Sequence, residues 1–374
     1  MILWLNIANN IKMIEEFKIN IQDQKISSIY QKVKEYNWDV IANLDGWEHG
    51  TNKDYLKEIC NYWVDKYDWT KCEKILNKFS NFKTKVDNID IHFIKEVGSG
   101  NNPKTLLLMH GWPGSVFEFS NIIDHLAHPE KYGGSKEDGL TIIAPSLPGF
   151  GFSSAPKKPY GPRKIAEILN KLMFNNLGYK TYVAQGGDWG ATIANWLGYD
   201  HSKHCKAIHI NCLTMRNPSG AKTEEEKRWL IKFDQDQLIQ DGYRTQQATK
   251  PQTLSYAMMD SPVGIAAWIL EKLHGWSDLK NQNIESVYSK DELLTNIMIY
   301  LCTDSFSTST WIYFGRREEG GRFFPKDFKK IEVPTGIAIF PKEMSEWPPR
   351  SYVDRIFNVQ HWTQMSSGGH FAAL

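Results

Sequence analysis

Short, continuous apolar runs recur along the chain from residue 105 onward. They are TLLLMHG at Thr105, LTIIAP at Leu140, TYVAQGG at Thr181, KAIHINC at Lys206, TGIAIFP at Thr335 and RIFNVQHW at Arg355. Amphipathic stretches such as KIAEILNKLMFNNLG separate the earlier runs. Apolar strands that alternate with helices are typical of a mostly parallel sheet with helices on both faces. The pattern therefore predicts an α/β fold.

Two further patterns precede the first of these runs. Apolar residues recur at helical spacing over residues 24–82, which predicts a helical N-terminal segment. The stretch NIDIHFIKEV, at residues 88–97, then alternates apolar residues with Asp90 and His92. This period of two predicts a half-buried antiparallel strand at the edge of the sheet.

The alternation of strand patterns and helix patterns is interrupted between residues 215 and 330. This interval contains long helical patterns and no strand pattern, so we expect a helical cap over the carboxyl edge of the sheet. The chain then divides into four parts: a helical segment packing on the core (1–82), the first part of the core (83–214), the cap (215–330) and the second part of the core (331–374).

The stretch QGGDWG lies where a strand ends and a helix begins, which is where ligands bind in open α/β sheets. Its glycines suit a sharp turn that holds the central residue, Asp188, in a strained conformation at the apex. A hydrolase with this pattern usually carries serine there. Taken alone, Asp188 could also be an ordinary helix N-cap.

A second motif, HGWPGS at residues 110–115, follows the run at Thr105. Glycine and proline directly after a strand let the chain turn, so that the backbone N–H of Trp112 faces the site. Together with the backbone N–H of Trp189, this group would form an oxyanion hole.

The end of the chain supplies a histidine in the order that this class of hydrolase requires, which is nucleophile, acid and then histidine. His370 follows a glycine-rich loop after the last strand. Glu343 and Glu346 follow the strand before it, and either could bond the imidazole. We select Glu343, because it is closer to the strand end.

The chain resembles the epoxide hydrolases of the microsomal and juvenile-hormone type, a branch of the α/β-hydrolase superfamily. The resemblance runs from about residue 17 to the C-terminus and rests on the stretches HGWPGS, PSLPGFGFS, QGGDWG, DGYRTQQATKPQTL, DSPVGIAAWILEK, FPKE and GGHFAAL. It implies that Asp188 is the nucleophile, His370 the base and Glu343 its orienting acid. It also implies two acidic tyrosines in the cap, which match Tyr243 and Tyr313.

An aspartate suits this chemistry better than a serine. Serine would open an epoxide to an ether, whereas a carboxylate gives an ester that water can cleave. Phenols can protonate the oxygen of the opening ring. We therefore predict hydrolysis of apolar epoxides to vicinal diols through an ester on Asp188, in epoxide metabolism and detoxification.

Composition limits the partners. The 44 basic and 43 acidic residues give a net charge of +1, which offers no field for nucleic acid or an anionic membrane. The five cysteines have no metal-type spacing, and we expect free buried thiols in a reducing compartment. The first 20 residues predict neither a membrane span nor a signal peptide. We expect a soluble cytoplasmic enzyme without metal or cofactor, acting on a small epoxide and water; homodimerisation stays open.

Two alternatives remain at this point. A haloalkane dehalogenase also has a nucleophilic aspartate at this sharp turn from strand to helix. A halide, however, leaves without a proton, so that reaction needs no phenols from the cap. An inactive relative could bind an apolar ligand without turnover. Because the chain ends at Leu374, four residues after His370, we expect His370 to be less well fixed than in relatives.

Overall fold

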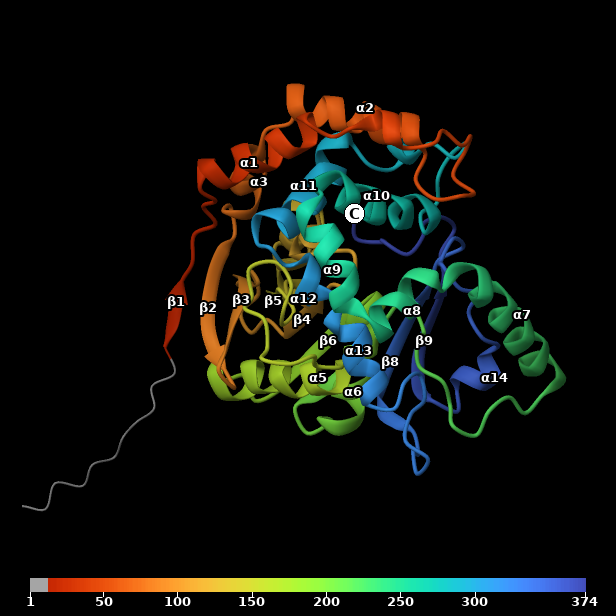
Figure 1. Cartoon of the computed structure of the whole chain (residues 1–374). Helices are drawn as coiled ribbons and strands as arrows, with labels where there is room; N and C mark the ends of the chain where they lie inside the picture. The colour runs from red at the N-terminus through yellow and green to blue at the C-terminus, as the bar shows by residue number, and fades with distance from the viewer. Residues whose placement is uncertain (1–12) are drawn as a thin grey trace, which may run out of the picture.

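The computed structural model describes residues 13–374, which form a nine-stranded sheet surrounded by helices (Figure 1). The strand order is β1-β2-β3-β5-β4-β6-β7-β8-β9. The strands are β1 (Ile14–Glu16), β2 (Ser80–Val86), β3 (Ile89–Glu96), β4 (Thr105–Met109), β5 (Thr141–Pro145), β6 (Tyr182–Gly186), β7 (Cys205–Ile210), β8 (Ile331–Ile339) and β9 (Phe357–Gln364). All neighbours from β5 to β9 pair in parallel, and the pairs among β1, β2, β3 and β5 are antiparallel. The mostly parallel sheet predicted from the apolar runs is confirmed.

Strand β3 is antiparallel, as predicted, but it is not an edge strand. It pairs with β2 on one side and β5 on the other. Its polar residue His92 is fully buried, and its ring nitrogens lie 2.9 Å from Ser146 Oγ and 2.9 Å from Asn81 Oδ1. The prediction was wrong because side-chain hydrogen bonds satisfy a polar position that the alternation had assigned to solvent.

Helices cover both faces of the sheet. Those outside the interval between β7 and β8 are α1 (Asp23–Lys34), α2 (Lys53–Asp65), α3 (Trp69–Leu76), α4 (Ile123–Ala127), α5 (Pro162–Lys171), α6 (Asp188–Asp200) and α14 (Arg350–Val353). Short turns of 3-10 helix are η1 (Trp38–Val40), η2 (Val116–Phe119), η3 (Pro129–Tyr132), η4 (Lys136–Asp138) and η6 (Ile284–Ser286), and one π-helical turn is η5 (Leu172–Asn176). Helix α6 packs on β4, β6, β7 and β8, so its first residue lies at the centre of the sheet.

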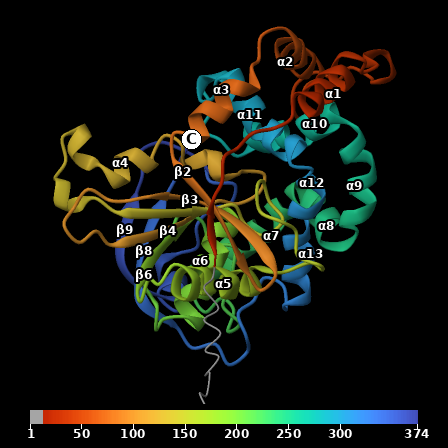
Figure 2. The same cartoon turned by 90° about the vertical axis from the view of Figure 1, so that its left-hand side faces the viewer.

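A group of seven helices, which we call the inserted helices, lies between β7 and β8. They are α7 (Glu224–Gln240), α8 (Gly242–Thr249), α9 (Pro251–Asp260), α10 (Pro262–Gly275), α11 (Lys290–Cys302), α12 (Phe306–Ser309) and α13 (Trp311–Glu318). Helices α1 and α2 contact α10 and α11 (Figure 2). The N-terminal helices thus pack on the inserted helices, while β1 and β2 extend the sheet. The four-part division of the chain stays a prediction.

Other expectations from composition can be compared with the structure. All five cysteines are buried and free, as predicted. Most of the opening segment that we considered as a membrane span lies outside the described residues. Among residues 13–374, no helix is both long and apolar enough to cross a bilayer.

The turn from β6 into α6 is closely packed and depends on glycine. A Cβ on Gly186 would lie 2.2 Å from the carbonyl carbon of Gly190. A Cβ on Gly190 would lie 2.1 Å from the carbonyl oxygen of Met109, at the end of β4. Between these glycines, Asp188 has a φ of +46°, which is unusual for a residue with a side chain. The sharp turn predicted around Asp188 is therefore present.

This close packing predicts the effect of one added methyl group. We expect Gly190→Ala to reduce the free energy of unfolding by about 2 kcal/mol or more, because the new Cβ meets backbone that cannot move aside. Urea unfolding measures the loss. In the control Gly275→Ala the exposed Cβ meets nothing within 4 Å, so we expect a change within about 0.5 kcal/mol. Equal stabilities of the two variants would contradict this reading of the turn.

Candidate active site

Asp188 lies at the start of α6, with its carboxylate against the turn after β4. The backbone N–H of Trp112 donates a 2.7 Å hydrogen bond to Asp188 Oδ1. A Cβ on Gly111 would lie 2.2 Å from the same oxygen, so only glycine fits there. The turn HGWPG and the turn QGGDWG, separate in sequence, thus meet at one carboxylate.

His370 and Glu343 form a buried pair beside Asp188. His370 Nδ1 donates a 2.6 Å hydrogen bond to Glu343 Oε1, and the backbone N–H of Met344 donates to the same oxygen. His370 Nε2 lies 3.4 Å from Asp188 Oδ2. Glu346 instead pairs with Lys232 on the surface. The structure thus brings Asp188, His370 and Glu343 together in one row.

The loop that carries His370 is well held, contrary to our expectation. The backbone N–H of His370 donates to the carbonyl oxygen of Trp276 at 2.9 Å, and the N–H of Gly368 donates to Asp278 Oδ2 at 2.9 Å. The N–H of Lys342 donates to the carbonyl oxygen of Gly368 at 3.1 Å. The expectation of a loosely fixed histidine was wrong, because the segment after α10 and the end of β8 hold this loop.

Tyr243 and Tyr313 face the same site from the inserted helices. Tyr243 lies on α8 and Tyr313 on α13, and their rings meet edge to face with centroids 5.9 Å apart. The ring of Trp112 stacks on Tyr243 at 5.5 Å and meets Tyr313 at 5.8 Å. Trp189 also contacts Tyr313, with ring centroids 4.6 Å apart. Both phenols are therefore fixed by aromatic packing.

The surroundings of these phenols favour their protonated form. Burial, the other phenol and the charge of Asp188 raise the pKa of Tyr313 well above 10. Burial and the charge of Asp188 likewise raise the pKa of Tyr243. Both groups therefore carry their protons at neutral pH and are available as hydrogen-bond donors or acids.

The two predicted backbone donors differ in the structure. The N–H of Trp112 bonds the carboxylate of Asp188, whereas no such bond from the N–H of Trp189 is seen. Trp189 is the second residue of α6, where a backbone N–H has no acceptor within the helix. Its N–H is thus unused within the helix and remains a candidate donor.

Comparisons with known proteins identify the family of this chain. A family model described as "Epoxide hydrolase N terminus" matches residues 14–119, and one described as "alpha/beta hydrolase fold" matches residues 104–258. Epoxide hydrolase 1 of Oryctolagus cuniculus is 37% identical over 96% of this chain and 85% of its own length. The chain belongs to the epoxide hydrolase family. Juvenile hormone epoxide hydrolase 1 of Ctenocephalides felis is 32% identical over 96% of this chain and 82% of its own.

A solved structure of the family has the same architecture. The crystal structure of juvenile hormone epoxide hydrolase from Bombyx mori matches with a TM-score of 0.85 and 29% identity. It covers 97% of this chain, and 91% of the Bombyx chain is matched. The α/β-hydrolase fold is thus established for this member of the epoxide hydrolase family. The comparisons favour an epoxide hydrolase over the dehalogenase and over a binding protein without turnover.

Sequence reasoning missed Glu118, a carboxylate close to the catalytic pair. Burial raises the pKa of Glu118 to about 8, with His370 opposing the shift and Asp188 adding to it. The carboxyl group occupies the space where a Cβ on Gly114 would lie. Its position in HGWPGSVFEF, one helical turn after Gly114, was the available signal.

Three arginines that line the pocket were also missed. Arg244, Arg316 and Arg322 lie in the same pocket as Asp188 and Tyr243. Aromatic side chains surround Asp188, as expected, but the pocket is not apolar throughout. The arginines come from three separate segments, and nothing in their spacing marks them as neighbours.

The charge on His370 is set by the two carboxylates beside it. Burial alone would lower the pKa of His370, but Glu343 and Asp188 raise it to about 10. An unfolded histidine has a pKa of about 6.5. The protonated imidazole therefore stabilises the folded state fully below a pH of about 6.5, and this contribution is lost as the pH rises through about 10.

This linkage predicts a pH-dependent effect of Glu343→Gln. The variant should lower the melting temperature most near pH 6, because it removes the strongest of the two charges that favour the imidazolium. The difference in melting temperature between the variant and the wild type should become smaller as the pH approaches about 10. Thermal unfolding followed by circular dichroism measures the difference, with Glu332→Gln, at an exposed position of the preceding strand β8, as control. A difference that does not change with pH would refute the linkage.

Proposed function

We propose that the protein converts apolar epoxides to vicinal diols through a covalent ester on Asp188. One observation carries the proposal. At the turn from β6 into α6, where a hydrolase with this pattern usually carries serine, this chain has Asp188, and its carboxylate shares a pocket with the protonated phenols of Tyr243 and Tyr313. The carboxylate permits a hydrolysable intermediate, and the phenols suit an alkoxide leaving group. Cytoplasmic location and homodimerisation stay predictions.

In the first half-reaction, Asp188 attacks one carbon of the epoxide ring. A carbon–oxygen bond forms to the carboxylate, and the ring bond from that carbon to oxygen breaks. Tyr243 or Tyr313 donates a proton to the ring oxygen, which takes the electron pair. The raised pKa of each phenol supports this role, because the group holds its proton until an alkoxide begins to form.

Ester formation changes the charge around His370. The ester at Asp188 is neutral, so one of the two carboxylates that raise the pKa of His370 is lost. The imidazole then loses its proton to solvent more readily and becomes a general base, while the phenolate left by the first half-reaction takes a proton back from solvent. The order of the two half-reactions thus follows from the charge of one side chain.

A second, small cavity offers a place for the hydrolytic water. It has about 30 Å³ of space and is lined by Glu118 and His370 together with Gly111, Gly187 and Asp188. This is enough for one water molecule, and the lining groups provide polar partners. The cavity lies beside the pocket that Tyr243 and Tyr313 line. Water in the cavity can therefore reach the ester on Asp188 without displacing the alkyl group of the substrate.

In the second half-reaction, His370 takes a proton from this water as the oxygen attacks the ester carbonyl carbon. Glu343 orients the imidazole and stabilises its positive charge. The oxyanion forms on Asp188 and receives the N–H of Trp112, joined by that of Trp189. One such donor is worth about 3 kcal/mol in other hydrolases. As the tetrahedral species collapses, the bond from the carbonyl carbon to the alkyl oxygen breaks, this oxygen takes the proton from His370, and the diol leaves with the carboxylate of Asp188 restored.

The central test is to trap the ester. We expect His370→Gln to form the ester with styrene oxide and to hydrolyse it about 10²-fold to 10⁴-fold more slowly, because the general base is missing. Intact-protein mass spectrometry should show a gain of one substrate mass, located on Asp188 by peptide mapping. Asp188→Asn, the matched control, should give neither adduct nor diol. Diol formation by His370→Gln at the wild-type rate would overturn the assignment.

Glu118→Gln tests the water cavity. A carboxamide keeps the shape but changes the hydrogen bonding of the water, so ester hydrolysis should slow by about 10-fold to 100-fold. Formation of the ester should change far less. Rapid-quench kinetics separate the two steps, and the exposed Glu225→Gln should behave like wild type. Equal slowing of both steps by Glu118→Gln would argue for a general structural effect instead.

A further inference from the structure

Two side chains of helix α11 bond the turn that carries the backbone N–H of Trp112. Asn296 Nδ2 donates a 2.7 Å hydrogen bond to the carbonyl oxygen of Pro113. Tyr300 Oη donates a 2.6 Å hydrogen bond to the carbonyl oxygen of Gly114. These carbonyl groups belong to the two residues that directly follow Trp112. One of the inserted helices therefore fixes the backbone next to the predicted oxyanion donor.

The amide of Asn296 also accepts a hydrogen bond from the turn. Ser115 Oγ donates to Asn296 Oδ1 at 3.1 Å. The amide thus bonds the turn through both its donor and its acceptor, and the two bonds together fix its orientation. Asn296 and Tyr300 are four residues apart in α11, so they lie on the same face of the helix. Three hydrogen bonds therefore join one helix face to three consecutive residues of the turn.

The three side chains that form these bonds are buried. Asn296 is 4% exposed, Tyr300 1% and Ser115 2%. Within residues 13–374, Asn296 and Tyr300 are the only hydrogen-bond donors to the two carbonyl oxygens. A buried carbonyl group without a partner is costly, so the turn gains much from keeping these bonds.

The packing of α11 and the protonation of Tyr300 keep these bonds in place. Every residue from Leu293 to Cys302 is buried, and the helix packs on α2, α3 and α10. Burial, followed by the charges of Glu118 and Asp188, raises the pKa of Tyr300 well above 10. The phenol therefore keeps its proton at neutral pH and remains a hydrogen-bond donor.

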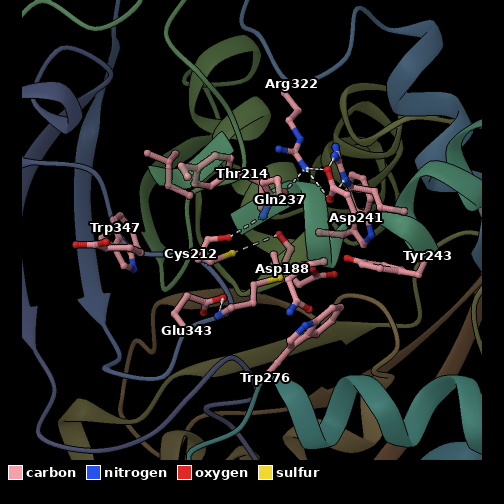
Figure 3. Close-up of a pocket in the computed structure, with 18 of the residues that line it drawn as sticks. Asp188, Cys212, Thr214, Gln237, Asp241, Tyr243, Trp276, Arg322, Glu343 and Trp347 are labelled. Carbon is pink, nitrogen blue, oxygen red and sulfur yellow. Dashed lines mark hydrogen bonds and ion pairs between the residues drawn. The ribbon is translucent and has the colours of Figure 1, made fainter. Parts of the chain in front are cut away.

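Asn296 and Tyr300 can act on Asp188 only through the turn. Figure 3 shows the side chain of Tyr243 pointing toward Asp188 within the pocket. Asn296 and Tyr300, in contrast, are not among the residues that line this pocket. The link is the backbone N–H of Trp112, because its 2.7 Å bond to Asp188 Oδ1 depends on where the turn lies.

We propose that Asn296 and Tyr300 are positioning residues for the oxyanion hole. They hold the turn so that the N–H of Trp112 meets the oxygen of Asp188 on which the oxyanion forms. This inference rests on the proposed ester mechanism and extends it to residues outside the pocket. The inserted helices thus supply the support for the backbone donor as well as the two phenols.

A positioning role of this kind affects one half-reaction and not the other. While the ester forms, the carboxylate of Asp188 loses its negative charge, so its hydrogen bond from Trp112 becomes weaker. When water attacks the ester, negative charge develops on this oxygen and the bond becomes stronger. Only an interaction that is stronger in the transition state than in the state before it accelerates a step. Correct placement of the N–H therefore speeds ester hydrolysis and not ester formation.

The test measures both half-reactions with styrene oxide by rapid quench. We expect Tyr300→Phe to hydrolyse the ester about 10-fold more slowly, because a displaced oxyanion donor loses part of its effect. Ester formation should keep its wild-type rate. Intact-protein mass spectrometry should therefore show a larger fraction of the enzyme as the ester during turnover. Asn296→Leu, which removes two of the bonds, is a second variant with the same expectation.

Tyr67→Phe and Thr295→Val are the matched controls. The hydroxyl groups of Tyr67 and Thr295 form a buried 3.0 Å hydrogen bond between the segment after α2 and α11. Each control thus removes a buried hydrogen bond of the same helix without touching the turn. Both controls should lower the melting temperature, as the test variants do, and both should keep the wild-type rates of the two half-reactions.

The possible outcomes separate this inference from the proposed function. Ester hydrolysis at the wild-type rate in both Tyr300→Phe and Asn296→Leu would overturn the inference alone. Equal slowing of both half-reactions, or the same slowing in Tyr67→Phe, would mean that these side chains act through general stability, and would overturn it as well. If the wild type forms neither ester nor diol from styrene oxide, the proposed function fails and the inference fails with it.

Discussion

The site is built around the close approach of two backbone turns, one after β4 and one between β6 and α6. Gly190 touches the end of β4, and Gly111 touches the carboxylate of Asp188, so neither of these two positions has room for a side chain. This close approach lets the backbone N–H of Trp112 donate a hydrogen bond to the carboxylate of Asp188, whose backbone has a left-handed conformation. Such a conformation costs on the order of 1–3 kcal/mol, which the surrounding sheet and helix packing must offset. The positions of the histidine and the tyrosines matter only because this carboxylate is fixed.

The charge of Asp188 links the remaining groups. It raises the pKa of His370 and of both tyrosines, so the free site carries a proton on each of them. Converting this carboxylate to an ester removes that influence at the moment when a base is needed. One group therefore acts as nucleophile and sets the protonation of its partners. The inserted helices contribute to both ends of this arrangement, since they carry the tyrosines and, at Trp276, hold the histidine loop.

Much of this arrangement could be predicted from sequence, because the carboxyl ends of parallel strands meet at one edge of a sheet. Asp188, Trp112 and Glu343 each follow such a strand, so their strand-end positions implied their proximity. Features that depend on contacts between distant segments could not be predicted. The pairing of β3 with β5, the bond from His370 to Trp276 and the ion pair of Arg322 with Asp241 leave no local pattern. Glu118 was missed because a carboxylate in a short helical turn looks like a surface residue until its surroundings are known.

The most direct test of the account is to follow the oxygen atoms in a single turnover. Excess enzyme would react with styrene oxide in water labelled with heavy oxygen. Mass spectrometry would then measure the label in the diol and in the peptide that contains Asp188. An ester on Asp188 predicts an unlabelled diol in the first turnover, because its new oxygen comes from the carboxylate, and heavy oxygen in Asp188. A labelled first diol with an unlabelled Asp188 would mean that water attacks the epoxide directly, and would contradict the account.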